Sequence, residues 1–371
     1  MAGTYKRIAK RFFLFLNSLV ALLFLVVCLI PYVDVAHFWA VSLLGLGFAI
    51  LFLFLILFIF FWAVVDPKYI LLSLLTVAIG YKSIAVLFAA NAPDTFQYTK
   101  TPGTVRVLSW NVARFLELTR NNNSKSKKRI KMFDLIKQQN ADVLCFQEFF
   151  HSTDTTLYNN IDPIKALGYP YFYYAWDEDG GNQWFGQAIF SRYPIVDSGL
   201  VHFPYPTQPE SLIHADILCG KDTIRFYTTH LQSVKFRSQD YQSIEEIKNR
   251  EDSLLQNSRS IIEKLKRGTV FRAQQAGVVK KELAMSPHPF VITGDFNDVP
   301  NTYTYFKISD GLQDAFLKRG FGIGRTFSAL SPTLRIDHIL ATHDFDVLQF
   351  NRQVKPYSDH YMIVADLRLR K

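Results

Sequence analysis

Residues 291–297 read VITGDFN, and the interpretation of the whole chain starts from this stretch. Its first three residues, Val291-Ile292-Thr293, form the apolar, β-branched run that is typical of a buried strand. Gly294 follows, and then a carboxylate and an amide, Asp295 and Asn297, come within four residues of the strand. One such ending is a turn more often than an active site, so its meaning depends on whether other strands end in the same way.

Several other strand-like runs carry polar side chains at their ends. Asn111, Glu148 and His230 each follow an apolar run directly, and two further acid-containing pairs, Asp337-His338 and Asp359-His360, lie next to the last two runs. Strands that share one core bring their ends together at the edge of a sheet. The sequence therefore predicts that these side chains converge on a single cleft.

The residue types in this set suit one kind of chemistry. Carboxylate and amide oxygens are preferred ligands of Mg²⁺ and Mn²⁺, and the three cysteines (Cys28, Cys145 and Cys219) lack the spacing of a zinc site. Phosphoryl transfer requires charge neutralisation on the phosphate, a group that activates water, and neutral hydrogen-bond donors. A histidine such as His360 can deprotonate water when a carboxylate fixes its tautomer.

Taken in order, the motifs resemble those of the endonuclease/exonuclease/phosphatase superfamily, which includes DNase I-like nucleases and neutral sphingomyelinases. The motifs are Ser109-Trp110-Asn111, Phe146-Gln147-Glu148, Thr228-Thr229-His230, Gly294-Asp295-Phe296-Asn297, Arg335-Ile336-Asp337-His338 and Ser358-Asp359-His360. The resemblance covers about Val105 to Leu369. It implies an α/β fold, the DNase I-like four-layer α/β sandwich, with its cleft at the strand ends.

The resemblance also implies a metal site for Mg²⁺ or Mn²⁺. Glu148 is similar to the family's main metal ligand, Asn111 lies beside it in the motif set, and Asp359 is expected close to the metal.

The same resemblance implies five catalytic residues. His360 is similar to the general base or phosphate-contacting histidine, oriented by Asp337, and Asp295 to the residue that positions or deprotonates the attacking water. Asn297 and His230 are similar to donors to the phosphate. Whether Asp295 or His360 takes the proton stays open.

Three apolar runs fill the first ninety residues, at 12–30, 38–65 and 69–90. A helix needs about 20 apolar residues to cross about 30 Å of hydrocarbon, so each run predicts a transmembrane helix. Lys82 in the third run is costly unless it reaches the interface. A cleaved signal peptide is the alternative for the first run, but no small-residue cleavage site precedes Pro31.

Flanking charges predict the orientation of these helices. Four basic residues within 6–11 place the N-terminus in the cytoplasm, and the segment 31–37 has no Lys or Arg. Three crossings then put the rest of the chain on the outer, periplasmic or extracellular, side of a plasma or inner membrane. If the third run does not span, the rest is cytoplasmic.

The predicted organisation is a transmembrane region at 1–90, a polar linker at 91–104 and a catalytic domain at 105–371. The whole chain has a formal net charge of +9, and the first ninety residues hold six bases and two acids, so the remainder has +5. This mild positive charge is compatible with an anionic substrate without specifying nucleic acid.

The leading hypothesis is a membrane-anchored, metal-dependent phosphoric ester hydrolase acting on a phosphodiester. A sphingomyelinase-like phospholipid or other small phosphoester is favoured, because a membrane anchor keeps the enzyme in the plane of a lipid substrate. A surface endonuclease or exonuclease acting on DNA or RNA is the alternative. Repair of abasic DNA sites is disfavoured. AP endonucleases of this superfamily commonly carry Asp two residues after the motif asparagine, where this chain has Ala113. A non-catalytic receptor or scaffold is the hypothesis from another class, and no protein partner is predicted.

Overall fold

The computed structural model describes residues 2–92, 94–116, 127–154, 159–179, 181–206, 210–234 and 254–370. The chain divides into two compact units, which are described separately. The first unit holds Met1–Phe88, Lys235–Val270 and Val299–Phe306, and the second holds Ala89–Val234, Phe271–Asp298 and Lys307–Lys371.

The first unit is built from apolar helices. They are α1 (Ala2–Cys28), α2 (Val35–Gly45), α3 (Phe48–Val65), α4 (Ile70–Ile79) and α5 (Tyr81–Leu87). Two stretches, Thr4–Tyr32 and Phe48–Val65, are long and apolar enough to cross a membrane. The helices on either side of Gly80 pass the same test only as a pair, and they are bent by 67°. The structure therefore contains two candidate spans, or three if the bent pair is one.

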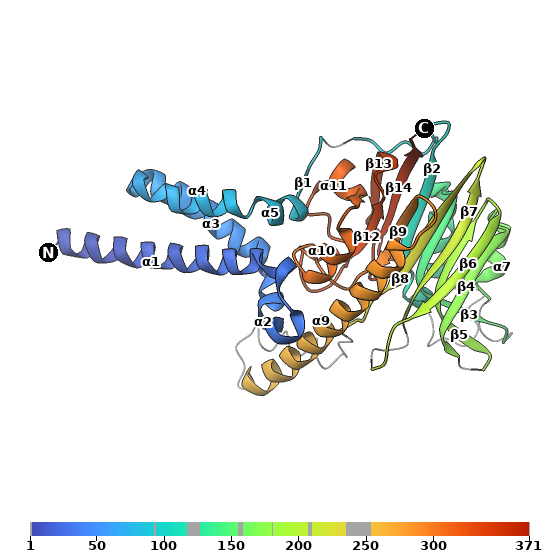
Figure 1. The fold of residues 1–371 in the computed structure, drawn as a ribbon, viewed down its shortest axis with the longest axis horizontal. Helices are drawn as coiled ribbons and strands as arrows, with labels where there is room; N and C mark the ends of the chain where they lie inside the picture. Colours follow the sequence, from blue (N-terminus) through green and yellow to red (C-terminus); the bar gives the residue numbers. More distant parts are fainter. Residues whose placement is uncertain are drawn as a thin grey trace. The chain divides into compact units, whose positions relative to one another are not determined.

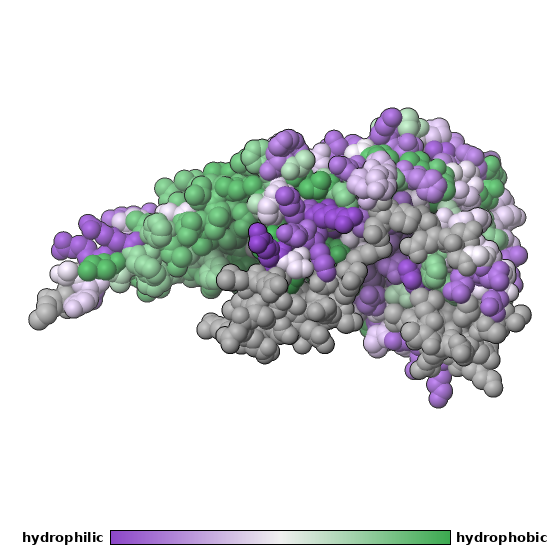
Figure 2. Space-filling model, turned by 90° about the horizontal axis from the view of Figure 1, so that it is seen from below, coloured by the Kyte–Doolittle hydropathy of each residue, from purple (hydrophilic) through white to green (hydrophobic). Residues whose placement is uncertain are grey.

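The outer surface of these helices is as apolar as their interior. Phe24, Leu55 and Trp62 are fully buried in the core of the unit, whereas Phe15 and Val64 are 68% and 88% exposed. Figure 2 shows the continuous apolar surface that results, and the polar region near the N-terminus of α1. Exposed apolar side chains on this scale are expected of helices that face lipid.

Glycines explain why the predicted runs 38–65 and 69–90 are not single straight helices. The first run contains α2 and α3, with a break at Leu46-Gly47, and the second bends at Gly80. A Cβ on Gly80 would lie 2.3 Å from the Phe24 ring, so only glycine allows the bent pair to approach α1 so closely. Lys82 follows this bend and its side chain is exposed.

A short segment from much later in the sequence also belongs to the first unit. Residues Val299–Phe306 pack on the apolar helices, where Tyr303 contacts the hydrophobic core. A Cβ on Gly45 would lie 2.3 Å from the carbonyl oxygen of Asn301, so α2 and this segment are in close backbone contact. Only Asp298 separates the segment from Asn297.

The second unit contains two six-stranded sheets (Figure 1). The first has the order β10-β12-β9-β8-β7-β6 and the second β13-β14-β2-β3-β5-β4. Neighbouring strands are antiparallel except for β2 with β3 and β8 with β9, which are parallel. The strands are β2 (Val105–Asn111), β3 (Val143–Ser152), β4 (Tyr171–Asp179), β5 (Gln183–Ser191), β6 (Ile195–His202), β7 (Ser211–Cys219), β8 (Asp222–His230), β9 (Phe290–Asp295), β10 (Gln313–Asp314), β12 (Asp337–Ala341), β13 (Phe345–Gln353) and β14 (Met362–Leu369).

The sheets pack face to face, with helices outside. Val107 and Ile363 of one sheet share a buried core with Phe226 and Val291 of the other. On its outer face the second sheet packs against α6 (Lys127–Gln139) and α7 (Ile161–Ala166). Beside the first sheet lies α9 (Leu254–Ala284), where the Tyr227 hydroxyl donates to the Glu282 carbonyl at 3.4 Å. This arrangement is the predicted DNase I-like four-layer α/β sandwich.

The second unit also pairs β1 (Ala89–Ala90) with β11 (Phe321–Gly322). The predicted linker 91–104 is docked on this unit, since Asn91 donates to the Gly320 carbonyl at 2.9 Å and the Gln97 amide to Gln349 at 2.9 Å. Of the remaining helices, α11 (Ala315–Arg319) belongs to the second unit, whereas α10 (Tyr303–Ser309) begins in the first unit and ends in the second.

The polar sequence between His230 and Pro289 has two stretches with helical periodicity, which predict two helices, and the structure differs from this expectation. The two predicted helical patterns, near 241–265 and 271–284, are one continuous helix where the structure describes them, because α9 runs through the residues between them. Residues 235–253 lie outside the described part of the chain.

Candidate active site

The polar strand endings meet at one edge of the sandwich. His230 and Asp295 are directly paired at the ends of the parallel strands β8 and β9, and Asp337 pairs with Asp295 from the start of β12. In the other sheet Asn111 ends β2 beside β3, which carries Glu148. The predicted convergence therefore follows from strand register, because parallel neighbours end side by side.

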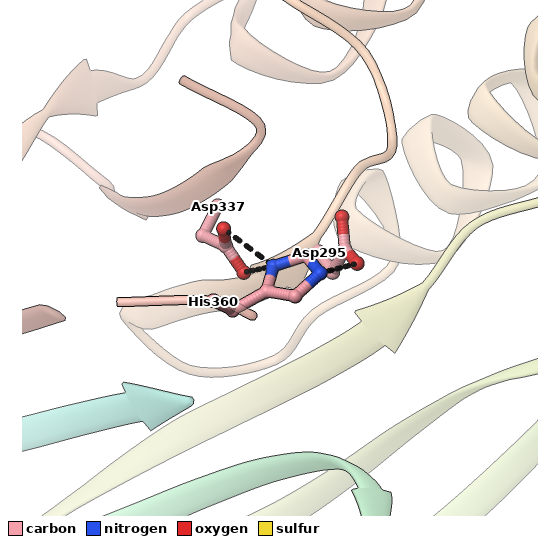
Figure 3. A group of neighbouring side chains, drawn as sticks. All are labelled: Asp295, Asp337 and His360. Carbon is pink, nitrogen blue, oxygen red and sulfur yellow. Dashed lines mark hydrogen bonds and ion pairs between the residues drawn. The ribbon is translucent and has the colours of Figure 1, made fainter. Parts of the chain in front are cut away.

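Asp337, His360 and Asp295 form a buried row (Figure 3). The Nδ1 atom of His360 lies 3.0 and 3.1 Å from the two carboxylate oxygens of Asp337, and its Nε2 lies 3.5 Å from Oδ2 of Asp295. The imidazole is thus held between two carboxylates, each of which can accept one of its N–H groups.

This row has unusual proton affinities. Burial alone would lower the pKa of His360, but Asp337 and Asp295 outweigh it and raise the pKa to about 10. Burial raises the pKa of Asp295 to about 6, helped by Asp337 and opposed by His360 and His230. At neutral pH the ring therefore keeps its proton, and Asp295 is the group poised to accept one.

Asn111, His230 and Glu148 surround the other side of Asp295. The Asn111 amide donates to Asp295 at 3.1 Å and to Glu148 at 3.3 Å. His230 Nε2 lies 3.6 Å from Asp295 and 3.9 Å from Glu148. The Glu148 side chain is 34% exposed while Asp295 is buried, so the site opens to solvent at Glu148.

Backbone conformation directs Glu148 and Asn297 into place. Glu148 has φ 49° and lies where β3 and β5 shift register, a bulge of the kind that re-aims a side chain. Asn297 has φ 52°, its backbone N–H donates to Asp295 at 2.8 Å, and its side-chain amide donates to the Leu231 carbonyl at 2.9 Å. Asn297 thus contacts the site through its backbone, and one N–H of its side chain is already used.

Gly294 allows this turn to form next to β8. Its φ is 141°, and a Cβ there would lie 2.0 Å from the carbonyl oxygen of Thr229. Any other residue would force the ends of β8 and β9 apart, and with them His230 and Asp295.

Asp359 is placed differently from the other predicted site residues. Its side chain is exposed, and its Oδ1 lies 3.2 Å from the Ser358 hydroxyl, which donates to the Asn111 carbonyl. Its charge contributes to raising the pKa of His360, so it is near the row without belonging to it.

Several supporting residues gave no signal in the sequence. The Thr326 hydroxyl accepts the backbone N–H groups of Ile336 and Asp337 at 2.9 and 3.0 Å, which fixes the start of β12. The Phe327 ring lies 5.0 Å from the His360 ring. Both lie in an irregular segment without strand or helix periodicity, so pattern analysis could not find them.

The donor set fits a hard divalent cation. Glu148 offers a carboxylate at the solvent-facing side of the site. The buried Asn111 offers an amide oxygen, which also accepts the Ala113 N–H at 3.0 Å. Both oxygen types suit Mg²⁺ or Mn²⁺. Distance alone would also group Asp295, Asp337 and His360 as ligands, since their atoms lie within 4.8 Å of one another. Both ring nitrogens of His360 face a carboxylate, Nδ1 that of Asp337 and Nε2 that of Asp295, which argues against that grouping. Burial raises the pKa of Cys145 to about 12, so its thiol is not a metal ligand at neutral pH.

A two-sheet sandwich with carboxylates and a histidine–aspartate pair at the strand ends defines the class of DNase I-like phosphoesterases. Residues 108–360 match the model of the endonuclease/exonuclease/phosphatase family, and the chain belongs to that family. Members of the family hydrolyse phosphoesters and are usually metal-dependent, and the fold supports a phosphoesterase or nuclease activity. Residues 10–87 match a domain of unknown function, DUF8431. No curated protein matches the chain in sequence.

Solved structures share the fold at low sequence identity. An endonuclease/exonuclease/phosphatase from Beutenbergia cavernae is 20% identical over 72% of each chain, with a TM-score of 0.52. A humanized D. rerio TDP2 with 14 mutations is 17% identical over 72% of this chain and 99% of its own, with a TM-score of 0.50. The human Nocturnin catalytic domain with bound sulfate is 16% identical over 72% of this chain and 94% of its own, with a TM-score of 0.50.

Proposed function

We propose that this protein is a membrane-anchored phosphodiesterase whose reaction depends on Mg²⁺ or Mn²⁺. The observation that supports this most directly is the convergence of Asn111, Glu148 and His230 on the buried row of Asp295, Asp337 and His360. Glu148 and Asn111 thus offer oxygen ligands for a cation. The histidines and Asp295 offer N–H donors and a proton acceptor for phosphoryl transfer.

In the proposed reaction, Asp295 accepts a proton from the attacking water as the water oxygen bonds to phosphorus. The ester P–O bond opposite breaks, and the alcohol leaves after taking a proton from solvent. The raised pKa of Asp295 suits its role, and His360, with a pKa raised to about 10, already holds its own proton. Asp337 fixes the imidazole so that Nε2–H points toward Asp295 and the substrate, and His230 donates to a phosphate oxygen. Glu148 and Asn111 would hold the cation, which supplies charge neutralisation on the phosphate when bound.

We propose a phospholipid head group or another small phosphoester as the substrate. The apolar helices support this choice, because anchoring the chain in a bilayer would keep the site near lipid substrates. A nuclease activity is the alternative. It would lose affinity steeply as salt is raised, since phosphate-backbone binding releases counterions.

A substrate panel tests the proposal. The full-length chain in detergent, with Mg²⁺, would be offered sphingomyelin, phosphoinositides, DNA, RNA and bis(p-nitrophenyl) phosphate. We expect chelator-sensitive turnover that falls by about 10²–10⁴-fold in Glu148→Gln, because a cation-binding carboxylate is lost. Asp344→Asn, an exposed carboxylate beyond the far end of β12, is the matched control and should keep full activity. Unchanged turnover in Glu148→Gln would refute the mechanism.

We also propose that α1, α3 and the bent α4–α5 pair all cross the membrane, which puts residues 91–371 on the outer side. The bases within 6–11 support a cytoplasmic N-terminus, and Lys82 follows the bend with an exposed side chain. A reporter that is active only outside the cytoplasm, fused after Ala90, should be active. An inactive reporter with a functional cytoplasmic counterpart would place the catalytic unit inside.

A further inference from the structure

Two arginines flank the segment that carries His360. Arg352 lies on β13, its guanidinium donates to the backbone carbonyl of Arg325, and its charge lies 5.9 Å from the ring of Tyr361. Tyr361 directly follows His360 in the chain. Arg352 is therefore in contact with both segments that meet beside the catalytic histidine.

The segment of Arg325 is paired with the segment of His360. The Tyr361 N–H donates to the Thr326 carbonyl at 2.7 Å, the Ser328 N–H donates to the Asp359 carbonyl at 2.8 Å, and Phe327 is bridged to His360. Arg325 is two residues from Phe327, whose ring lies 5.0 Å from the His360 ring, and its guanidinium donates to the Phe327 carbonyl at 2.6 Å.

The charges of these two arginines are not neutralised within the described chain. Arg325 donates to the carbonyls of Phe327 and Ser328, and Arg352 donates to that of Arg325, and neither forms an ion pair with a described carboxylate. Burial lowers the pKa of Arg352, and the charge of Arg325 lowers it further. Each guanidinium uses fewer than half of its five N–H groups on these carbonyls.

Buried arginines elsewhere in the second unit are treated differently. Arg106 is paired with Asp366 at 2.6 Å and Arg335 with Asp314 at 2.6 Å. Each of these two buried arginines is neutralised by a carboxylate of the fold. Arg325 and Arg352 are two partly buried cations close to each other, and their hydrogen-bond acceptors are neutral carbonyls. An anionic ligand would therefore supply the missing negative charge.

We propose that Arg325 and Arg352 bind a second phosphate group of the substrate, next to the phosphodiester that is hydrolysed. This inference rests on the proposed function, which it deepens by naming the substrate class: a phosphodiester with an additional phosphate monoester. Two guanidiniums match the charge and the oxygen geometry of such a group. A phosphorylated lipid head group and the terminal phosphate of a nucleotide share this chemistry.

Matched substrate pairs test the subsite. One arm compares the dinucleotides pTpT and TpT, the other phosphatidylinositol 4-phosphate and phosphatidylinositol in mixed micelles, and bis(p-nitrophenyl) phosphate serves as the substrate with no second phosphate. In at least one of the two pairs, the one that resembles the natural substrate, the wild type should have a lower KM for the phosphorylated member than for its partner. Arg352→Gln should raise that KM by about tenfold or more and leave kcat and the other substrates unchanged, because a charged hydrogen bond to one phosphate is lost.

Two variants serve as controls. Arg352→Lys keeps the charge and should retain part of the preference. Arg370→Gln removes an exposed arginine paired with Asp346 just beyond the far end of β14, about 33 Å along the extended chain from His360, and should change nothing.

Three outcomes would overturn the proposal. They are equal KM values within both pairs for the wild type, no effect of Arg352→Gln, or an equal fall in kcat on all substrates, which would mean that Arg352 only positions the His360 segment. If the wild type hydrolyses none of the substrates, the proposed function fails instead. Calorimetry with pyrophosphate then decides the subsite, since binding by the wild type must be lost in Arg352→Gln.

Discussion

Two histidine–aspartate clusters lie on opposite faces of β12, and only one of them has the features of an active site. Asp337 faces His360 at 3.0 Å, while its neighbour His338 is buried against Phe296 and lies 3.8 Å from Asp314. Neighbouring residues of a strand point to opposite faces, so a single step along the chain separates the two environments.

The charge balance of the two clusters is opposite. Two carboxylates face His360 and raise its pKa to about 10. Burial and the Arg335 guanidinium lower the pKa of His338, and the nearby Asp314 does not compensate for them. An Asp-His pair in the sequence therefore does not define a catalytic histidine. The partners that other strands contribute decide whether the ring is charged.

The largest expected difference between the clusters is in catalysis. His360→Ala should lower kcat by about 10²–10⁴-fold, because the proposed reaction uses His360 as a donor and charge partner at the phosphate. His338→Ala should leave kcat of the folded protein within a few fold. Steady-state kinetics on the best substrate of the panel measures both, and comparable losses in the two variants would abolish the distinction.

The next difference is in stability. Asp314→Asn should destabilise the protein by about 3–5 kcal/mol, because it breaks the buried pair with Arg335, whose Nη1 lies 2.6 Å from the carboxylate. The exposed Asp344→Asn should stay within about 0.5 kcal/mol of the wild type. Thermal unfolding of the full-length chain in detergent gives the comparison. A melting temperature of Asp314→Asn equal to that of the control would show that the pair is not structural.

The smallest difference is in the pH dependence of stability, where the two histidines should act with opposite sign. A free histidine has a pKa of about 6.5. The pKa of His360 is raised to about 10 in the fold, so its stabilising contribution is complete below about pH 6.5 and is lost as the pH rises through about 10. The pKa of His338 is lowered, so its contribution is complete above about pH 6.5 and is lost as the pH falls.

The sign of each pH dependence can be measured from melting temperatures, recorded in the presence of a metal chelator. The gap between the wild type and His360→Gln should narrow from pH 7 to pH 10, and the gap between the wild type and His338→Gln should narrow from pH 7 to pH 5. Gaps that narrow in the same direction would contradict the assigned charge states.

Much of the fold was predictable because buried strands have a recognisable sequence pattern. The runs that became β2, β3, β8 and β9 are apolar and β-branched, and their polar endings were correctly expected to meet. The edge strands β6 and β13 were missed, since most of their side chains are only half-buried or exposed and carry no clear alternation.

The features that could not be predicted depend on contacts between segments that are distant in the sequence. The exposure of Asp359, the carbonyl contacts of Arg325 and the support that Thr326 gives to Asp337 all arise from a segment with no periodic pattern. The bend at Gly80 likewise depends on the Phe24 ring in another helix, and a single apolar run contains no sign of it.

The placement of Val299–Phe306 has a practical consequence for anyone who wishes to crystallise a soluble fragment. A chain shortened to begin at Ala89 would retain this segment but lose the helical surface on which Tyr303 rests. The Tyr303 side chain, six residues after Asn297, would then be exposed to solvent and would promote aggregation of the fragment. Replacing Tyr303 with a polar residue, or retaining the helices, would remove this source of aggregation from tests of the second unit.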